Sequence, residues 1–244
     1  MAVRHNPQPN GNILRDWAAS HQLPDAGYVE LQTVPYRGHS LQADAVLRHC
    51  PPGGVVFEGG VSSGYFAQVL RDHGLVVDGA EIDPDAAARA RTVCRKVIVG
   101  DLAELDLSEL VGDYDALVFG DTLEHMIDPV SLLSRLKPRL KREGVLVVSV
   151  PNIANWAIRA SLLAGRFRYT DRGIMDRTHV HFYTVATLRE MLGDAGYEVT
   201  EVHGAIPIPG ITTAFLCKLG YRIGNLRPSL FAYGLVVVAR PRGD

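Results

Sequence analysis

The fold is decided by one stretch of the chain, which reads Val55-Val56-Phe57-Glu58-Gly59-Gly60-Val61-Ser62-Ser63-Gly64-Tyr65-Phe66. Its apolar start predicts a buried strand, and apolar residues resume with helical spacing from Phe66. A strand, a glycine-rich turn and a helix together open a nucleotide-binding α/β unit, in which main-chain N–H groups at the helix start hold a polar ligand group. An isolated turn of this kind is more typical of simple helix-on-sheet packing. The ends of the other strands therefore decide whether a ligand binds here.

The alternation of strand and helix continues along the chain. After the first strand, strands are predicted at residues 75–82, 96–100, 114–119 and 144–150, then near 198–203 and 232–239. Helices are predicted at residues 85–95, 129–140 and 185–195. The apolar runs are nearly continuous, as in strands that helices cover on both faces. We therefore expect an α/β fold with a doubly wound, seven-stranded, mostly parallel sheet.

The chain length of 244 residues suits one elaborated domain. We expect an N-terminal extension over residues 1–49, with Ser40 as the N-cap of a helix that ends near residue 50, and a main domain over residues 50–244. Residues 152–184 form a long connection after the fifth core strand, and we expect this insertion to cover a substrate. The apolar segment 205–219 is expected to be a second lid or a homodimer contact.

Composition excludes several classes of function. A hydrophobic content of 47% is ample for a core, and a net charge of −2 argues against a broad nucleic-acid surface. Three well-separated cysteines show neither a disulfide framework nor metal-ligand spacing, which favours a reducing cytoplasm. The sequence shows neither a signal peptide nor a membrane span. We expect a cytoplasmic protein that acts on a small molecule, without a membrane partner.

Acidic residues follow three successive strands of the predicted sheet. Glu58, Glu81 and Asp101 would meet at one edge, because ligands bind at the carboxyl ends of parallel strands. An acid after the second strand accepts hydrogen bonds from a ribose diol, and an acid after the third can accept from the adenine amino group. An acid on the first loop disfavours a pyrophosphate and favours a cation, as in S-adenosylmethionine. The structural alternative for each acid is a helix cap, which for Asp83 is as good an interpretation as function.

With these residues, the chain resembles the class I S-adenosylmethionine-dependent methyltransferases over roughly residues 50–205. The resemblance implies a Rossmann-like methyltransferase fold. It also implies a cofactor-binding set of Glu58, Gly59, Gly60, Ser62, Gly64, Glu81, Ile82, Asp101, Leu102 and Asp121. Ser62 stands where the family has the middle glycine of its loop, so we expect a shifted loop or weaker binding.

A second group of residues predicts the chemistry. On one helical turn, Asp121 would lie beside Glu124 and His125, and the distant His179 or His181 could return to the same place. Methyl transfer to an alcohol requires a base or a metal, because an alcohol is a poor nucleophile until it loses its proton. His125 or His179 could be that base. Alternatively, Asp121, Glu124, His125 and His179 could hold Mg²⁺ or another divalent metal.

Further resemblances bear on the substrate. The Leu-Glu-His step at residues 123–125 is similar to that of ubiquinone-biosynthesis O-methyltransferases. The acid-x-x-Glu-His pattern also resembles metal-dependent 2′-O-methyltransferases of small-RNA ends, in which a later histidine completes the set. Residues 165–169 and 176–179 share patterns with bacterial sugar and natural-product methyltransferases. Together these imply an O-methyltransferase for a saccharide or natural product. The alternatives are an N- or C-methyltransferase and a non-catalytic S-adenosylmethionine-binding protein.

Overall fold

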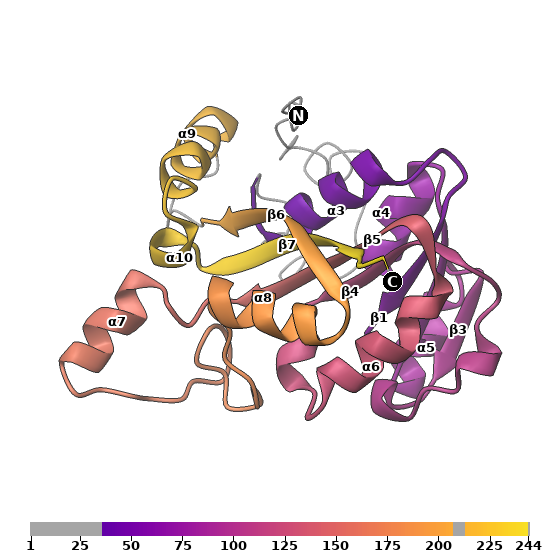
Figure 1. Ribbon diagram of the computed structural model, residues 1–244, viewed down its shortest axis with the longest axis horizontal. Coiled ribbons are helices and arrows are strands. Elements are labelled where there is room, and N and C mark those ends of the chain that lie inside the picture. Colours follow the sequence, from indigo (N-terminus) through magenta and orange to yellow (C-terminus); the bar gives the residue numbers. More distant parts are fainter. Residues whose placement is uncertain (1–35, 207–212, 244) are drawn as a thin grey trace.

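The computed structural model describes residues 36–206 and 213–243, and within them seven strands form one sheet (Figure 1). The strands are β1 (Val55–Gly59), β2 (Val76–Glu81), β3 (Lys96–Val99), β4 (Tyr114–Gly120), β5 (Leu140–Pro151), β6 (Tyr197–Ala205) and β7 (Gly234–Pro241). Their order is β3-β2-β1-β4-β5-β7-β6, and only β7 runs antiparallel to its neighbours. The predicted doubly wound, mostly parallel sheet is confirmed.

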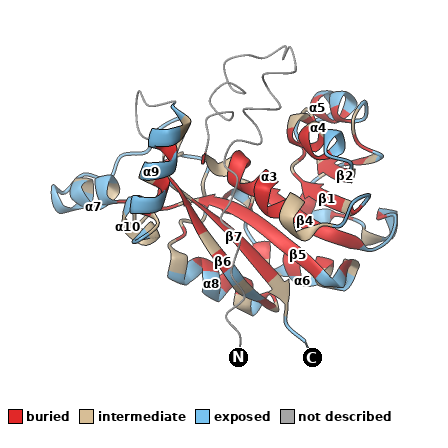
Figure 2. Ribbon diagram, turned by 90° about the horizontal axis from the view of Figure 1, so that it is seen from above, coloured by how far each residue is buried: buried red, intermediate tan, exposed pale blue. Residues whose placement is uncertain are grey.

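Helices cover both faces of this sheet. They are α3 (Gly38–His49), α4 (Tyr65–Asp72), α5 (Pro84–Ala90), α6 (Pro129–Leu136), α7 (Trp156–Leu163), α8 (Val185–Asp194), α9 (Ala214–Gly224) and α10 (Pro228–Phe231). Apolar residues of α3, α4 and α5 form one core cluster, and those of α6 and α8 form the other. Along β5, Val145 and Val147 enter the first cluster while Leu146 and Val148 enter the second. This two-sided burial, seen as the buried centre of Figure 2, explains why the strand sequences are apolar almost throughout.

Three helix boundaries differ from the prediction by more than one residue, and one of them is the end of α6, which stops at Leu136 because β5 begins at Leu140. The helix α3 begins before Ser40, with Arg37 at the N-cap, and Ser40 is buried inside the helix; its prediction as the cap is wrong. The helix α5 ends at Ala90, five residues early. Arg95 is instead drawn to the sheet, where its Nε lies 2.9 Å from Asp78. The cap interpretation of Asp83 is confirmed, since its carboxylate accepts the N–H of Asp85 at 2.8 Å.

The helix α3 belongs to the core, although the sequence analysis placed it in an N-terminal extension. Leu41 and Val46 are buried in the first cluster, and the side chain of Gln42 donates a hydrogen bond to the carbonyl of Phe119 in β4 at 3.2 Å. Residues 1–35 of the predicted extension lie outside the described residues. The packing of α3 therefore brings its first turns to the carboxyl end of the sheet.

The insertion at residues 152–184 leaves the sheet and returns to it. The helix α7 projects from the body of the molecule (Figure 1), and Figure 2 shows it largely exposed. At the end of the insertion, the N–H groups of Val180 and His181 donate to the carbonyl of Glu124 at 2.9 and 3.1 Å. The insertion is thus anchored beside the segment that follows β4.

Two further expectations bear on location and assembly. The cysteines Cys50, Cys94 and Cys217 are free thiols. Within residues 36–206 and 213–243, no helix has the length and apolar character needed to cross a bilayer. A cytoplasmic location and a homodimer contact at residues 205–219 stay predictions, and residues 207–212 of that segment lie outside the described ranges.

A buried carboxylate ties α3 to the far edge of the sheet. Glu201 of β6 accepts hydrogen bonds from Arg48 Nη2 at 3.0 Å, from His49 Nε2 at 2.8 Å and from His203 Nε2 at 2.9 Å. His203 in turn contacts the hydroxyl of Tyr221 in α9 at 2.8 Å. Burial alone would raise the pKa of Glu201, but the bonds from His203, His49 and Arg48 outweigh it and hold the pKa below its usual value.

We expect Glu201→Ala to lower the free energy of unfolding by about 3 kcal/mol, because it removes the buried acceptor that Arg48, His49 and His203 share and leaves Arg48 with Asp44 alone. Since the pKa of Glu201 is lowered in the folded state, its contribution is present above about pH 4.3 and is lost as the pH falls. Urea denaturation at pH 7 measures the loss. Glu198→Ala, an exposed carboxylate on the same strand, is the matched control. Equal stability of the two variants would contradict this account.

Candidate active site

The glycine-rich loop after β1 has positive φ angles at Gly60, Ser62 and Gly64. Gly60 has φ +78°, and a Cβ there would lie 2.9 Å from Thr122 Oγ1. Gly64, at the N-cap of α4, has φ +85°, and a Cβ there would lie 3.0 Å from Ala90 Cα. Ser62 itself adopts φ +49°, which a non-glycine residue tolerates at modest cost. Its N–H donates to Glu81 Oε2 at 2.7 Å, which fixes the loop against the end of β2.

A cavity of about 160 Å³ opens between this loop and α3. It is lined by His39, Gln42, Glu58, Gly60, Val61, Ser62, Tyr65, Phe66, Val118 and Gly120. Glu58 is the last residue but one of β1 and is only 7% exposed, and its Oε2 has no hydrogen-bond partner. Burial, and then the nearby Glu81, raise the pKa of Glu58 well above its usual value. A buried acid without a partner is the mark of a site for a cation or hydrogen-bond donor.

The acids after β2 and β3 combine structural and ligand-binding capacity. Glu81 accepts the N–H groups of Ser62 and Asp83, and each carboxylate oxygen keeps a further lone-pair direction for a ribose hydroxyl. Asp101 accepts the N–H of Ala103 at 2.8 Å and caps the 3₁₀ turn Leu102–Glu104. Ile82, which follows Glu81, is 65% exposed, while the side chain of Leu102, which follows Asp101, is buried.

His39 and Gln42, which both line this cavity, were not among the residues that the sequence analysis singled out. Burial lowers the pKa of His39, against the opposing influence of Asp121, so the imidazole is neutral at pH 7. Both residues lie in α3, before the first core strand. No motif marks them, because only the packing of α3 on the sheet brings them to Glu58.

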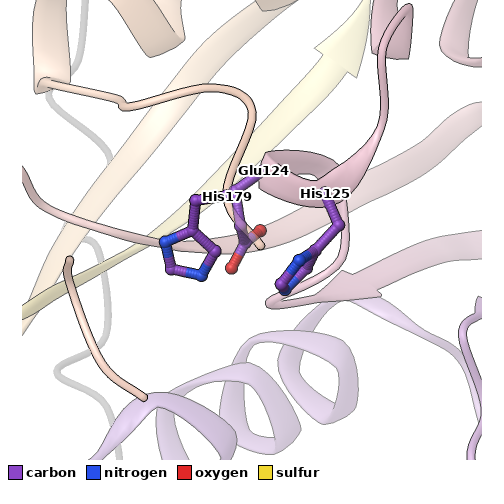
Figure 3. A group of neighbouring side chains, drawn as sticks. All are labelled: Glu124, His125 and His179. Atoms are coloured by element: carbon purple, nitrogen blue, oxygen red, sulfur yellow. The ribbon is translucent and has the colours of Figure 1, made fainter. Parts of the chain in front are cut away.

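A second cluster gathers beyond β4. Figure 3 shows the carboxyl group of Glu124 between the imidazole rings of His125 and His179. The ring centroids of the two histidines are 4.8 Å apart, and one candidate ligand atom from each of the three residues lies within 4.8 Å of the others. The structure thus brings together three of the four predicted metal ligands across more than fifty residues of sequence.

Asp121, the fourth of them, does not join this cluster. Residues Leu123–His125 form a 3₁₀ turn, and Asp121 precedes it with φ +48°. Its Oδ1 accepts a hydrogen bond from Ser149 Oγ at 3.0 Å. The expectation that Asp121, Glu124 and His125 share one helical turn is therefore wrong: the left-handed residue at 121 directs the chain away from α-helical geometry.

The hydrogen bonds of the two histidines fix their tautomers. His125 Nδ1 lies 3.3 Å from the carbonyl of Thr178, and His179 Nδ1 lies 3.3 Å from the carbonyl of Ile174. A carbonyl only accepts, so Nδ1 carries the proton in each neutral ring and Nε2 keeps its lone pair. Thr178 Oγ1, 3.1 Å from His125 Nδ1, donates its own proton to Asp176 at 2.7 Å and so agrees with this assignment for His125.

Two groups of the cluster, Glu124 and His179, are uncharged at neutral pH. Burial, followed by the influence of Asp121, raises the pKa of Glu124 to about 9, so its carboxyl group is protonated at pH 7. Burial, and the adjacent His125, lower the pKa of His179 and keep that imidazole in its basic form. His181 is not part of the cluster, because its Nε2 contacts the carbonyl of Ile127 at 3.0 Å.

Aromatic side chains of the insertion continue this cluster outward. Phe182 lies 6.2 Å from the His179 ring, and Phe167 and Tyr169 each lie 6.4 Å from Phe182, between ring centroids. Phe167 is 50% exposed and Tyr169 is 55% exposed. The insertion therefore presents an aromatic wall beside the histidine pair.

Comparison with known proteins identifies the family of this chain. A family model described as "Methyltransferase domain" matches residues 37–202. A probable S-adenosylmethionine-dependent methyltransferase of Mycolicibacterium smegmatis is 28% identical over 178 residues, which are 72% of this chain and 64% of the relative. The chain thus matches less than two thirds of that relative's length.

Two solved structures share the fold. The CcbJ methyltransferase of Streptomyces caelestis aligns with a TM-score of 0.60 and 18% identity, over 96% of this chain and 98% of that chain. Magnesium protoporphyrin IX methyltransferase of Synechocystis, solved with bound S-adenosylhomocysteine (SAH), aligns with a TM-score of 0.59 and 19% identity, over 94% and 93%.

We expect Asp101→Ala to weaken the binding of SAH about tenfold, because a hydrogen bond to a charged acceptor is lost. Calorimetry measures the affinity. The matched control is Asp106→Ala, since Asp106 caps the next 3₁₀ turn in the same way, accepting from Ser108 at 2.8 Å. If Asp101 were only a cap, the two variants would bind SAH equally well, and the cofactor role would be lost.

Proposed function

This chain belongs to the class I S-adenosylmethionine-dependent methyltransferases, and on that premise we propose that it methylates a hydroxyl group of a small molecule, a saccharide or natural product. The observation that carries the proposal is the pair His125 and His179, two adjacent imidazoles whose Nδ1 atoms face carbonyl oxygens, which leaves each Nε2 atom to accept a proton beside the carboxyl edge of the sheet. An alcohol needs such a base before it can accept a methyl group.

The residues present fit the cofactor. The buried edge offers acceptor oxygens, among which Glu58 Oε2 has no partner, and this suits a ligand that carries positive charge and N–H groups. In the proposed arrangement Glu58, Gly59, Gly60, Ser62 and Gly64 hold the methionine end, and Glu81 holds the ribose. Asp101, Ile82 and Leu102 meet the adenine, and Asp121 borders the methionine end near His39. When bound, S-adenosylmethionine supplies a methyl group on a positively charged sulfur.

The histidine pair and its neighbours have distinct roles in this proposal. His125 or His179 accepts the hydroxyl proton at Nε2, and the Nδ1–H bonds to Thr178 or Ile174 keep the ring in the required tautomer and stabilise the positive charge that develops. The protonated carboxyl group of Glu124 is available in the same space as a hydrogen-bond donor.

The insertion supplies the acceptor-binding wall. The faces and edges of Phe167, Tyr169 and Phe182 suit a planar or ring-shaped acceptor, such as a phenol or a sugar. Arg166 and Arg168 flank Phe167 and would bind a phosphate or carboxylate on that acceptor.

A metal-assisted mechanism is the second candidate, and it uses the same side chains. Glu124, His125 and His179 provide one carboxylate and two imidazoles at mutual distances that favour a divalent metal. Metal binding would require Glu124 to lose its proton, so it would compete with the raised pKa of that group. An N- or C-methyltransferase and a non-catalytic cofactor-binding protein are the remaining alternatives.

We expect His125→Ala to lower the turnover of hydroxyl acceptors by about 10²- to 10⁴-fold while the affinity for SAH stays unchanged, because only the base is removed. The measurement is SAH release from S-adenosylmethionine with a panel of phenols, sugars and matched amines. His73→Ala, an exposed histidine at the end of α4, is the control. Unchanged turnover in His125→Ala and in His179→Ala would remove both from the mechanism. Turnover of the amines alone would favour N-methylation, and none with any acceptor would favour the non-catalytic alternative.

The pH profile separates a base from a metal. Because burial lowers the pKa of His179, we expect kcat/KM to rise with pH and to reach its plateau before the pH has risen to about 6.5. We also expect kcat/KM to be insensitive to a chelator such as EDTA. Loss of activity in EDTA, restored by Mg²⁺, Mn²⁺ or Zn²⁺, would instead establish the metal-assisted mechanism.

A further inference from the structure

One buried acceptor of the cofactor cavity has no role in the account so far. Gln42 Oε1 has no hydrogen-bond partner, and the Gln42 side chain is completely buried. The residue comes from α3 and lines the same cavity as Glu58. A buried amide oxygen without a donor costs free energy, so its presence calls for an explanation.

The orientation of the Gln42 carboxamide is fixed by its other end. The Nε2 group donates to the carbonyl of Phe119 at 3.2 Å. A carbonyl only accepts, so the amide cannot be flipped without facing two oxygens toward each other. The Oε1 atom therefore lies on the side of Gly120, where a Cβ would approach it to 3.1 Å.

The cavity is thus lined by two residues with an unpartnered buried acceptor, Gln42 Oε1 from α3 and Glu58 Oε2 from β1. Neither is hydrogen-bonded to the other. His39, on the same wall as Gln42, is neutral and does not repel a cation. A small group with several N–H donors and a positive charge would satisfy both oxygens.

We propose that Gln42 is a cofactor-binding residue, whose carboxamide oxygen acts together with Glu58 to bind the primary ammonium group at the methionine end of the cofactor. The sulfonium offers no N–H, and the carboxylate of the same end has no donor for Gln42 Oε1, so the ammonium is the cofactor group that matches two acceptors. The inference rests on the cofactor assignment within the proposed function and is independent of the hydroxyl acceptor.

The test compares two ligands on two proteins by calorimetry. The ligands are SAH and its deaminated analogue, in which hydrogen replaces the amino group. The wild-type protein should bind SAH at least tenfold more tightly than the analogue. In Gln42→Met, which keeps the length of the side chain and removes the acceptor, the affinity for SAH should fall about tenfold while that for the analogue stays the same.

Equal losses for both ligands in Gln42→Met would mean that Gln42 only packs α3 against β4, and would overturn the proposal. So would equal binding of both ligands by the wild-type protein, which would indicate that an ordered water satisfies the two oxygens. Gln42→Glu keeps an acceptor at the same length and, when protonated, a donor for Phe119. It should therefore retain the preference for SAH, and it serves if the methionine variant does not fold. Failure of the wild-type protein to bind either ligand would instead overturn the cofactor assignment itself.

Discussion

The organisation of the site depends on a carboxyl group that the fold buries without a positive partner. Glu58 lies near the end of β1, an inner strand between β2 and β4, where helices cover both faces of the sheet. Burying an unpaired acid is costly, and this burial raises the pKa of the Glu58 carboxyl group well above its usual value. In the proposed function, that cost is offset when the cationic end of the cofactor binds. This is why the edge suits a positively charged donor and not a pyrophosphate.

The same constraint connects distant parts of the chain. The helix α3 closes the cavity over Glu58, and its position is fixed at one end by Gln42 on Phe119 and at the other by Arg48 and His49 on Glu201. On the opposite side, the end of the insertion is bound to the carbonyl of Glu124, which places His179 against His125. The cofactor cavity and the histidine pair are therefore held by two separate anchors on one rigid sheet.

Much of this arrangement could be predicted from the sequence, because topology alone decides where strand ends meet. Parallel strands bring Glu58, Glu81 and Asp101 to one edge whatever their side chains pack against. His39 and Gln42 could not be predicted in the same way. Gln42 and Phe119 are 77 residues apart, and no periodicity in the sequence specifies how α3 docks.

Local backbone geometry accounts for the remaining differences. The spacing of Asp121, Glu124 and His125 predicted one α-helical turn, but a left-handed residue at position 121 breaks that periodicity. The left-handed conformation of Asp121 is held by its two hydrogen bonds with Ser149 in β5. Ser62 likewise has a positive φ, of 49°, in a region that glycine adopts more readily than serine.

The central claim is that an acidic, largely acceptor-lined edge selects a cationic adenosine donor. Calorimetric titration with SAH at pH 7, in two buffers with different ionisation enthalpies, tests it most directly. Because burial raises the pKa of Glu58 in the free protein and an ammonium opposite it would lower that pKa, the account predicts that binding releases protons to the buffer, and that Glu58→Gln abolishes this release. The other groups around this end of the site, His39, Tyr65, Glu81, Cys94 and Asp121, remain in the Glu58→Gln variant, so the difference belongs to Glu58. Binding heats that are the same in both buffers, or binding of a nicotinamide dinucleotide in place of SAH, would contradict it.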